Sequence, residues 1–239
     1  MLRPAWLLVL VASCGEPRLV MKPLPELATP AVPLALVVPM LHLVTGESMI
    51  WDVQWRGMTI GRAELAIDDH EIRSKFATGK LASAFAHARH ELVTVLDAAS
   101  AHVVHATDVL ELDGETTHLD LAFHGTAVDG NATPLRVPPG NLPHTLHSAL
   151  GVIRAWASRG APAGFLYIVH AGELVRLDVA QPVETLLQNT PAWKIDGQIR
   201  VGGDTIALTL WLSADARRLP LRIELSANDE HITAELIAS

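Results

Sequence analysis

Histidine is the residue type in this chain with the most chemical potential, because there are 12 histidines against a single cysteine. His87 and His90 lie three residues apart in the stretch HARHE, with Glu91 beside them. A zinc-protease helix needs His-Glu-x-x-His, which places two imidazoles one helical turn apart next to a glutamate. The stretch has a different spacing. We therefore expect no metal-dependent catalysis here, and we assign no metal ligand and no cofactor.

Two further histidine pairs, His102 with His105 and His118 with His124, could meet across neighbouring strands. We interpret them as solvated surface residues. The sequence also has no Gly-rich phosphate loop, no Gly-x-Ser-x-Gly elbow and no redox cysteine pair. A catalytic set could still be assembled from distant residues. Nothing in the sequence favours one, so we expect no enzyme and name no catalytic residue.

The single cysteine, Cys14, follows an apolar run in MLRPAWLLVLVASC. Arg3 gives a positive start, an apolar segment covers 5–11, and two small residues come directly before the cysteine, which is the order of a secretory signal. A helix needs about 20 apolar residues to span a bilayer, so the segment is too short for a mature anchor. VASC also resembles the bacterial lipobox. We predict a signal peptide over 1–13 and lipid attachment at Cys14; a plain signal with an unmodified cysteine, or a wrong start codon, is the alternative.

Composition restricts the partners. The formal charge is −8 and no basic run of five or more residues occurs, which argues against nucleic acid or an anionic membrane surface as the main partner. One cysteine also excludes an internal disulfide and a thiolate-rich metal cluster.

Residues 15–45 carry prolines at 17, 23, 25, 30, 33 and 39, too closely spaced for a helix. We expect an extended Pro-rich tether over 14–45, part of which lies against either the folded domain or the membrane.

From Glu47 onward the hydrophobic pattern has a period of two. Trp51, Val53 and Trp55 alternate with polar residues, and after a turn at Gly57 the alternation resumes, which indicates an antiparallel hairpin. The same pattern returns at 91–97, 103–112, 117–125, 164–180, 193–201, 204–213, 219–225 and 231–238. The connections are short and polar, as tight turns require. We predict one β-rich domain over 46–239 with roughly eight to eleven strands.

Two stretches have a helical pattern instead. PHTLHSALGVIRAWASRG, residues 143–160, predicts a helix that starts at His144 or Thr145, stops at Gly160 and has one apolar face made of Leu146, Leu150, Ile153 and Ala157. Residues 80–89 could form a shorter helical turn. We therefore predict a mostly β protein: a strongly curved antiparallel sheet, half-barrel or barrel-like, with one amphipathic helix packed on it.

The stretch LWLSADARRLPLRIEL has a structural and a functional interpretation. Ser213 and Asp215 can satisfy the amides of a turn between two strands, and we favour that role. Alternatively, Arg217 or Arg218 lines the rim of a cavity.

Three stretches of the sequence together resemble the bacterial envelope family known as domain of unknown function 3108. They are GESMIWDVQWRGMTIGRAEL, LPHTLHSALGVIRAWASRG and LWLSADARRLPLRIEL. The resemblance covers roughly 46–238 and implies export and a fold type, but no catalytic residue.

The tryptophans and the strand alternation lead to a hypothesis about function. Large curved sheets leave interior room that side chains do not always fill. We expect an apolar ligand-binding cavity lined by Trp51, Val53, Trp55, Leu150, Ile153, Leu208, Leu210 and Ile223. The protein is then a non-enzymatic, periplasm-facing lipoprotein of the bacterial cell envelope, anchored in the inner or outer membrane, that binds or carries a hydrophobic small molecule or lipid. A scaffold that binds another envelope protein is the alternative, and an uncharacterised hydrolase comes third.

Overall fold

The computed structural model describes residues 34–80, 82–84, 87–98, 100, 102–131, 133–201 and 203–239. The first part of the chain forms β1 (Leu34–Ala35), β2 (Ser48–Trp55), β3 (Met58–Ile67), β4 (Glu71–Thr78), the 3-10 turn η1 (Ala82–Ala84), β5 (Ala88–Leu96), β6 (Val103–Leu112), β7 (Glu115–His124), β8 (Ala127–Gly130) and β9 (Leu135–Arg136). The second part forms β10 (Pro143–His144), α1 (Leu146–Trp156), β11 (Gly164–His170), β12 (Glu173–Val179), β13 (Val183–Leu187), β14 (Thr190–Val201), β15 (Asp204–Ser213), β16 (Pro220–Ala227) and β17 (Glu230–Ala238).

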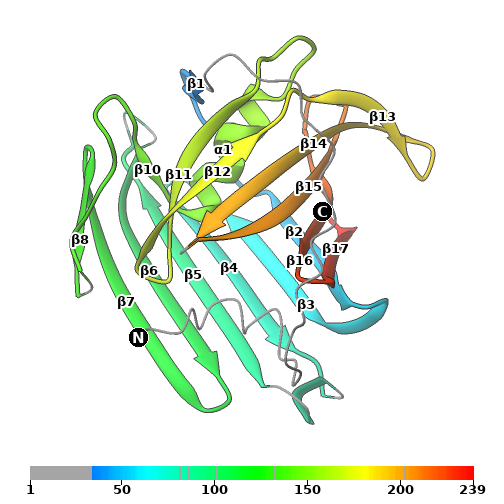
Figure 1. The fold of residues 1–239 in the computed structure, drawn as a ribbon, viewed down its shortest axis with the longest axis horizontal. Helices are drawn as coiled ribbons and strands as arrows, with labels where there is room; N and C mark the ends of the chain where they lie inside the picture. The colour runs from blue at the N-terminus through cyan, green and yellow to red at the C-terminus, as the bar shows by residue number, and fades with distance from the viewer. Residues whose placement is uncertain are drawn as a thin grey trace.

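All of these strands belong to one sheet, which curves around α1 (Figure 1). The chain makes two successive meanders, β2 to β9 and β10 to β17, and the sheet is continuous because β17 pairs with β2. Neighbours are antiparallel, except that β1 and β10 run parallel to β11. One edge of the sheet is β9 and the other is formed by β1 and β10, so the curved sheet is not closed. The predicted fold class is confirmed.

The strand count exceeds the prediction because short strands were not recognised. β1, β9 and β10 have two residues each, too few to show any alternation. β4 was missed although it has eight residues, because the polar Ser74 lies on its inward face between Ile72 and Phe76 and weakens the pattern. Among the described residues of 80–89, η1 is the helical part, and β5 already begins at Ala88.

The predicted helix is present but shorter. Thr145 caps its N-terminus: the Thr145 hydroxyl accepts a hydrogen bond from the Ser148 amide and the Ser148 hydroxyl accepts one from the Thr145 amide. The helix ends at Trp156, and not at Gly160, because Ala157 leaves the helical conformation. Leu146, predicted on the apolar face, is exposed. The buried residues of the helix are His147, Ser148, Ala149, Gly151, Val152, Ile153 and Arg154, so of the predicted apolar face within the helix only Ile153 is fully buried.

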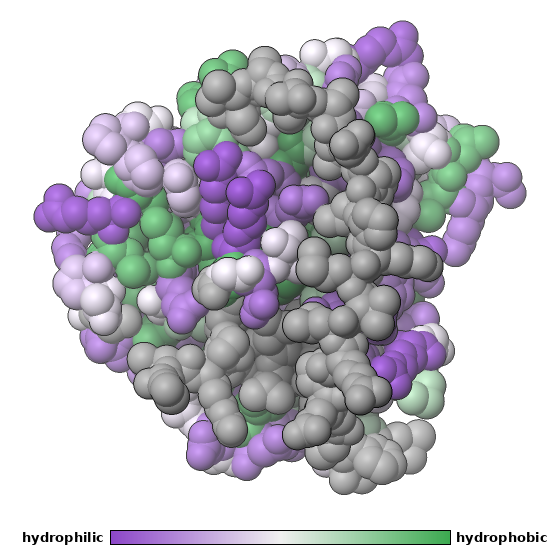
Figure 2. All heavy atoms as spheres, in the orientation of Figure 1, coloured by the Kyte–Doolittle hydropathy of each residue, from purple (hydrophilic) through white to green (hydrophobic). Residues whose placement is uncertain are grey.

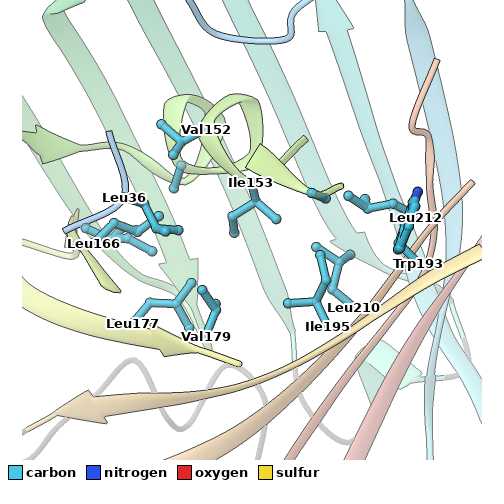
Figure 3. Close-up of a cluster of buried hydrophobic side chains, with 13 residues drawn as sticks. Leu36, Val152, Ile153, Leu166, Leu177, Val179, Trp193, Ile195, Leu210 and Leu212 are labelled. Carbon is cyan, nitrogen blue, oxygen red and sulfur yellow. The ribbon is translucent and has the colours of Figure 1, made fainter. Parts of the chain in front are cut away.

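The main core lies between α1 and the concave side of β11, β12, β14 and β15 (Figure 3). Val152 and Ile153 of the helix belong to one buried cluster with Leu166, Leu177 and Ile195 of the sheet (Figure 3). Each buried side chain of this size stabilises the folded state by about 1.5–3 kcal/mol relative to a side chain left exposed to water. The cluster also includes Leu36, because β1 pairs with β11 at Gly164. Residues 34–45, assigned from the sequence to the tether, thus lie against the folded domain.

A buried ion pair and a hydrogen bond of Arg154 hold the helix to the residue before β2 and to the turn between β15 and β16. Arg154 Nη2 lies 2.8 Å from Glu47 Oε2, and their side chains are 0% and 2% exposed. The same Nη2 donates a hydrogen bond to the Arg217 carbonyl at 2.7 Å. In the turn between β15 and β16, Asp215 accepts hydrogen bonds from the Arg217 and Arg218 amides, which confirms the predicted structural role of Asp215 in this turn.

Within the described part of the chain, no helix is long and apolar enough to cross a bilayer.

Candidate functional site

Two adjoining pockets open beside the N-terminal half of α1. The larger has a volume of about 350 Å³ and lies between the helix, the start of β6 and the loop before β10. Its apolar lining includes Leu41, Val103, Val104, Phe123 and Leu142. The smaller, of about 170 Å³, extends toward β1 and β11 along residues 35–41. Both are lined by Leu41, Ser100, His102, Leu142 and His144, so they adjoin along a common wall.

A local irregularity in the backbone positions the strand residues that line the larger pocket. The β5–β6 register shifts between Val95 and Leu96, at the point where Leu96 pairs with Val103. Both Val103 and the neighbouring Val104 line the larger pocket there. Asp97 Oδ1 accepts hydrogen bonds from the amide and the hydroxyl of Ser100, which holds the turn that leads into β6.

The polar groups of the pocket are mostly uncharged. Burial, and the charge of nearby His102, lower the pKa of His144 to about 4, so this imidazole is neutral at pH 7. Its Nδ1 lies 3.3 Å from the Ser148 hydroxyl. Among the described residues that line the two pockets there is one carboxylate, Asp97, and no lysine or arginine. The pocket therefore offers neutral hydrogen-bonding groups at His144 and Ser148.

Exposed apolar side chains surround the pocket mouths. Val37 and Met40 are 81% and 72% exposed, and Val104 and Leu142 are also exposed. On the face drawn in Figure 2, hydrophobic residues gather at the left, where Figure 1 shows β6 to β8, beside hydrophilic residues near the centre. Exposed apolar surface next to a pocket is typical of a ligand-binding or interaction site.

A second cluster of polar side chains lies where the β11–β12 turn meets β5 and β6. His90 Nε2 lies 2.8 Å from Asp108 Oδ1, and His170 Nδ1 lies 3.8 Å from Asp108 Oδ2. The Ala171 amide donates a hydrogen bond to the same carboxylate at 3.3 Å. One nitrogen from each imidazole and one carboxylate oxygen all lie within 4.8 Å of one another. This is a donor set that could hold a metal ion.

His147 connects the helix to the same inner face. Its Nδ1 lies 2.9 Å from the Thr94 hydroxyl and its Nε2 lies 2.8 Å from the Ser74 hydroxyl. The Thr94 hydroxyl donates to the hydroxyl of Thr145, the helix cap. Burial, with a contribution from the charge of His90, lowers the pKa of His147 to about 3. A neutral His147 thus links α1 to β4 and β5.

The eight residues predicted to line a cavity are in or near the core. Trp51, Val53, Ile153 and Leu210 are buried, and Trp55, Leu150, Leu208 and Ile223 are partly buried. The Trp51 indole donates to the Pro220 carbonyl at 2.8 Å, and the Trp55 indole donates to Glu230 at 2.6 Å. None of the eight lines either pocket. Their role in ligand binding stays a prediction, and Cys14 lies outside the described residues.

The structure separates the histidines that the sequence groups together. His87 is exposed and lies 3.5 Å from Glu111, whereas His90 faces inward to Asp108. His118 and His124 are exposed, as expected, while His102 lines both pockets. Sequence reasoning missed the pocket role of His144 and the inner position of His90. The strand pattern contained a signal for the second, because His90 shares a face with buried Leu92, two residues on.

Comparison with known proteins supports the fold only. No known family model matches the sequence, and no curated protein matches it significantly. The structure is similar to the crystal structure of a beta-barrel-like protein of domain of unknown function DUF1849 from Brucella abortus, with a TM-score of 0.58 and 12% identity over 82% of this chain and 97% of that chain. The fold is thus β-barrel-like.

Proposed function

We propose that this protein is a non-enzymatic lipoprotein of the bacterial cell envelope that binds a molecule with an apolar chain in the pocket beside α1. The observation that carries the proposal is the larger pocket. Its volume of about 350 Å³ falls in the range of small-molecule sites, roughly 300–1,000 Å³, and its mouth is apolar. The envelope location rests on the signal-like N-terminus and on Cys14.

The lining selects the class of ligand. An apolar chain can pack on Val103, Phe123 and Leu142, while a polar head reaches the neutral His144 and the Ser148 hydroxyl. The His144 imidazole is neutral at pH 7 and the Ser148 hydroxyl carries no charge, so neither group offers an anionic head group a compensating charge. The ligand is therefore a neutral single-chain amphiphile, such as a monoacylglycerol, and not a fatty acid or a phospholipid.

The test uses the full chain with Cys14→Ser, so that no attached acyl group competes for the pocket. Monolaurin should displace a neutral hydrophobic dye, Nile red, in a saturable manner with a dissociation constant in the micromolar range, about −8 kcal/mol. Laurate, which has the same chain and an anionic head, should bind at least about tenfold more weakly. Equal affinity for the two compounds would contradict the proposed selectivity.

A matched pair of variants locates the binding site. Val104→Trp fills the pocket mouth and should weaken monolaurin binding at least about tenfold, since the added ring occupies space the chain needs. Val183→Trp makes the same change at an exposed valine of β13, outside both pockets, and should bind like the parent. Absence of saturable displacement in the folded parent protein, or an equal loss in both variants, overturns the proposal.

A further inference from the structure

The cluster of His90, Asp108 and His170 is assembled from three strands. Leu92 of β5 is opposite Asp108 of β6, and His90 is opposite Leu110, so His90 and Asp108 lie on the same face of the sheet. That face is the inner one, because Leu92 and Ala106 on it are buried. His170 ends β11, directly before the Ala171–Gly172 turn, which Figure 1 draws over β6.

The turn is held in place by backbone geometry and by Asp108. Ala171 and Gly172 both have a positive φ, 49° and 76°, as a two-residue hairpin requires. This conformation aims the Ala171 amide at Asp108 Oδ2. His170 and Asp108 are thereby kept side by side, although 62 positions separate them in the sequence.

Asp108 is a buried carboxylate without a permanent cation beside it. Its side chain is 4% exposed. Among the described residues its ion-pair partners are His90 and His170, and no lysine or arginine pairs with it. A buried carboxylate is costly unless an opposite charge compensates it. The two imidazoles and the backbone amide carry no permanent positive charge, so a cation held between the imidazoles and the carboxylate would compensate Asp108.

We infer that His90 Nε2, Asp108 and His170 Nδ1 form a binding site for a zinc-like divalent metal ion. Tetrahedral zinc with bonds of about 2.0–2.2 Å places its ligand atoms about 3.3–3.6 Å apart. His90 Nε2 lies 2.8 Å from Asp108 Oδ1 and His170 Nδ1 lies 3.8 Å from Asp108 Oδ2, so the two separations lie on either side of that range. Imidazole with a single carboxylate favours zinc, cobalt or nickel over calcium or magnesium, which prefer oxygen ligands.

The site has an open side. The His90 and His170 side chains are 17% and 24% exposed, so an ion can enter without unfolding the sheet. His147 is not a fourth ligand in this geometry, because its two ring nitrogens are hydrogen-bonded to Thr94 and Ser74. Three protein ligands leave one position of a tetrahedral ion for water or a bound molecule. The ion would also attach the β11–β12 hairpin to β5 and β6.

The test is calorimetric titration of zinc into the metal-free full chain without an affinity tag. One ion should bind per chain with a micromolar or tighter dissociation constant, and cobalt should give the visible absorption bands of a tetrahedral site. His170→Ala should weaken binding at least about tenfold and abolish the cobalt bands. Because His170 is partly exposed at a hairpin turn, this variant is expected to fold, which circular dichroism would verify.

A similar histidine–aspartate pair supplies the control. His105 Nε2 lies 3.1 Å from Asp120 Oδ1 on the neighbouring strands β6 and β7, and among the described residues no second histidine joins this pair in a metal-ligand group. His105→Ala should leave zinc affinity unchanged. No saturable zinc or cobalt binding by the folded protein, or an equal effect of His105→Ala and His170→Ala, overturns the inference. Val104→Trp should leave zinc binding intact, because the pockets include none of the three ligands.

Discussion

The buried histidine His147 shows how much a single residue depends on its surroundings. It lies on α1, 3% exposed, and is satisfied by hydroxyl groups of two different strands. Desolvation disfavours the imidazolium form, and the charge of His90 adds to this while that of Asp108 opposes it. The folded protein thus keeps His147 neutral, whereas the unfolded chain exposes it to water.

This difference makes folding stability depend on pH. The folded-state pKa of about 3 lies below the ordinary value of 6.5, so the unfolded chain binds more protons between these limits. The stabilisation is fully present above pH 6.5 and decreases as the pH falls toward 3, by at most about 1.4 kcal/mol per pH unit. His147→Gln should therefore lose less free energy of unfolding between pH 7 and pH 5 than the wild type, measured by urea titration.

The control for this prediction is His118→Gln, a change at an exposed histidine of β7. It should show the same loss between pH 7 and pH 5 as the wild type. If His147→Gln and His118→Gln have the same pH dependence, His147 does not contribute to the acid sensitivity of the fold.

At the scale of elements, the short strand β1 depends on a glycine in its partner strand. A Cβ atom on Gly164 of β11 would lie 2.3 Å from Leu36 Cδ2 and 2.8 Å from the Leu34 carbonyl oxygen. Contacts this short force the neighbours to move, which typically costs about 1–3 kcal/mol. The pairing of β1 with β11 thus requires a residue without a side chain at position 164.

Gly164→Ala should lower the free energy of unfolding by about 1–3 kcal/mol and speed hydrogen exchange of the Leu36 amide, which is bonded to the Phe165 carbonyl. Gly79→Ala is the matched change, since its added Cβ would meet nothing closer than 3.8 Å. It should leave exchange at Leu36 unchanged. Equal protection of Leu36 in both variants would show that β1 is not held in the way the structure indicates.

At the scale of the whole molecule, the predicted anchor decides where the domain works. Two or three acyl chains, each worth about 0.8 kcal/mol per buried methylene, hold a protein firmly on a membrane. Cys14→Ala should therefore move the protein from the membrane to the soluble fraction and abolish incorporation of a labelled fatty acid. The domain should stay folded. A wild-type protein that takes up no label and fractionates as soluble would show that Cys14 is not lipidated.

The sequence by itself determined the features that depend on neighbouring residues. Alternation with period two predicted the antiparallel strands, the pair His144 and Thr145 predicted the start of α1 to within one residue, and Asp215 predicted the turn before β16. These are local preferences, set by backbone geometry within a few residues, so a linear pattern contains them. They were enough to predict a mostly β, strongly curved sheet with one helix.

Only the tertiary structure decided which distant groups meet. The pairing of β17 with β2, the ion pair of Arg154 with Glu47, and the approach of His170 to Asp108 each join positions far apart in the chain. The curvature of the sheet and the position of α1 also decide which side chains enclose the pocket. Such contacts arise because the whole chain buries its apolar faces together, and no local pattern specifies the partner.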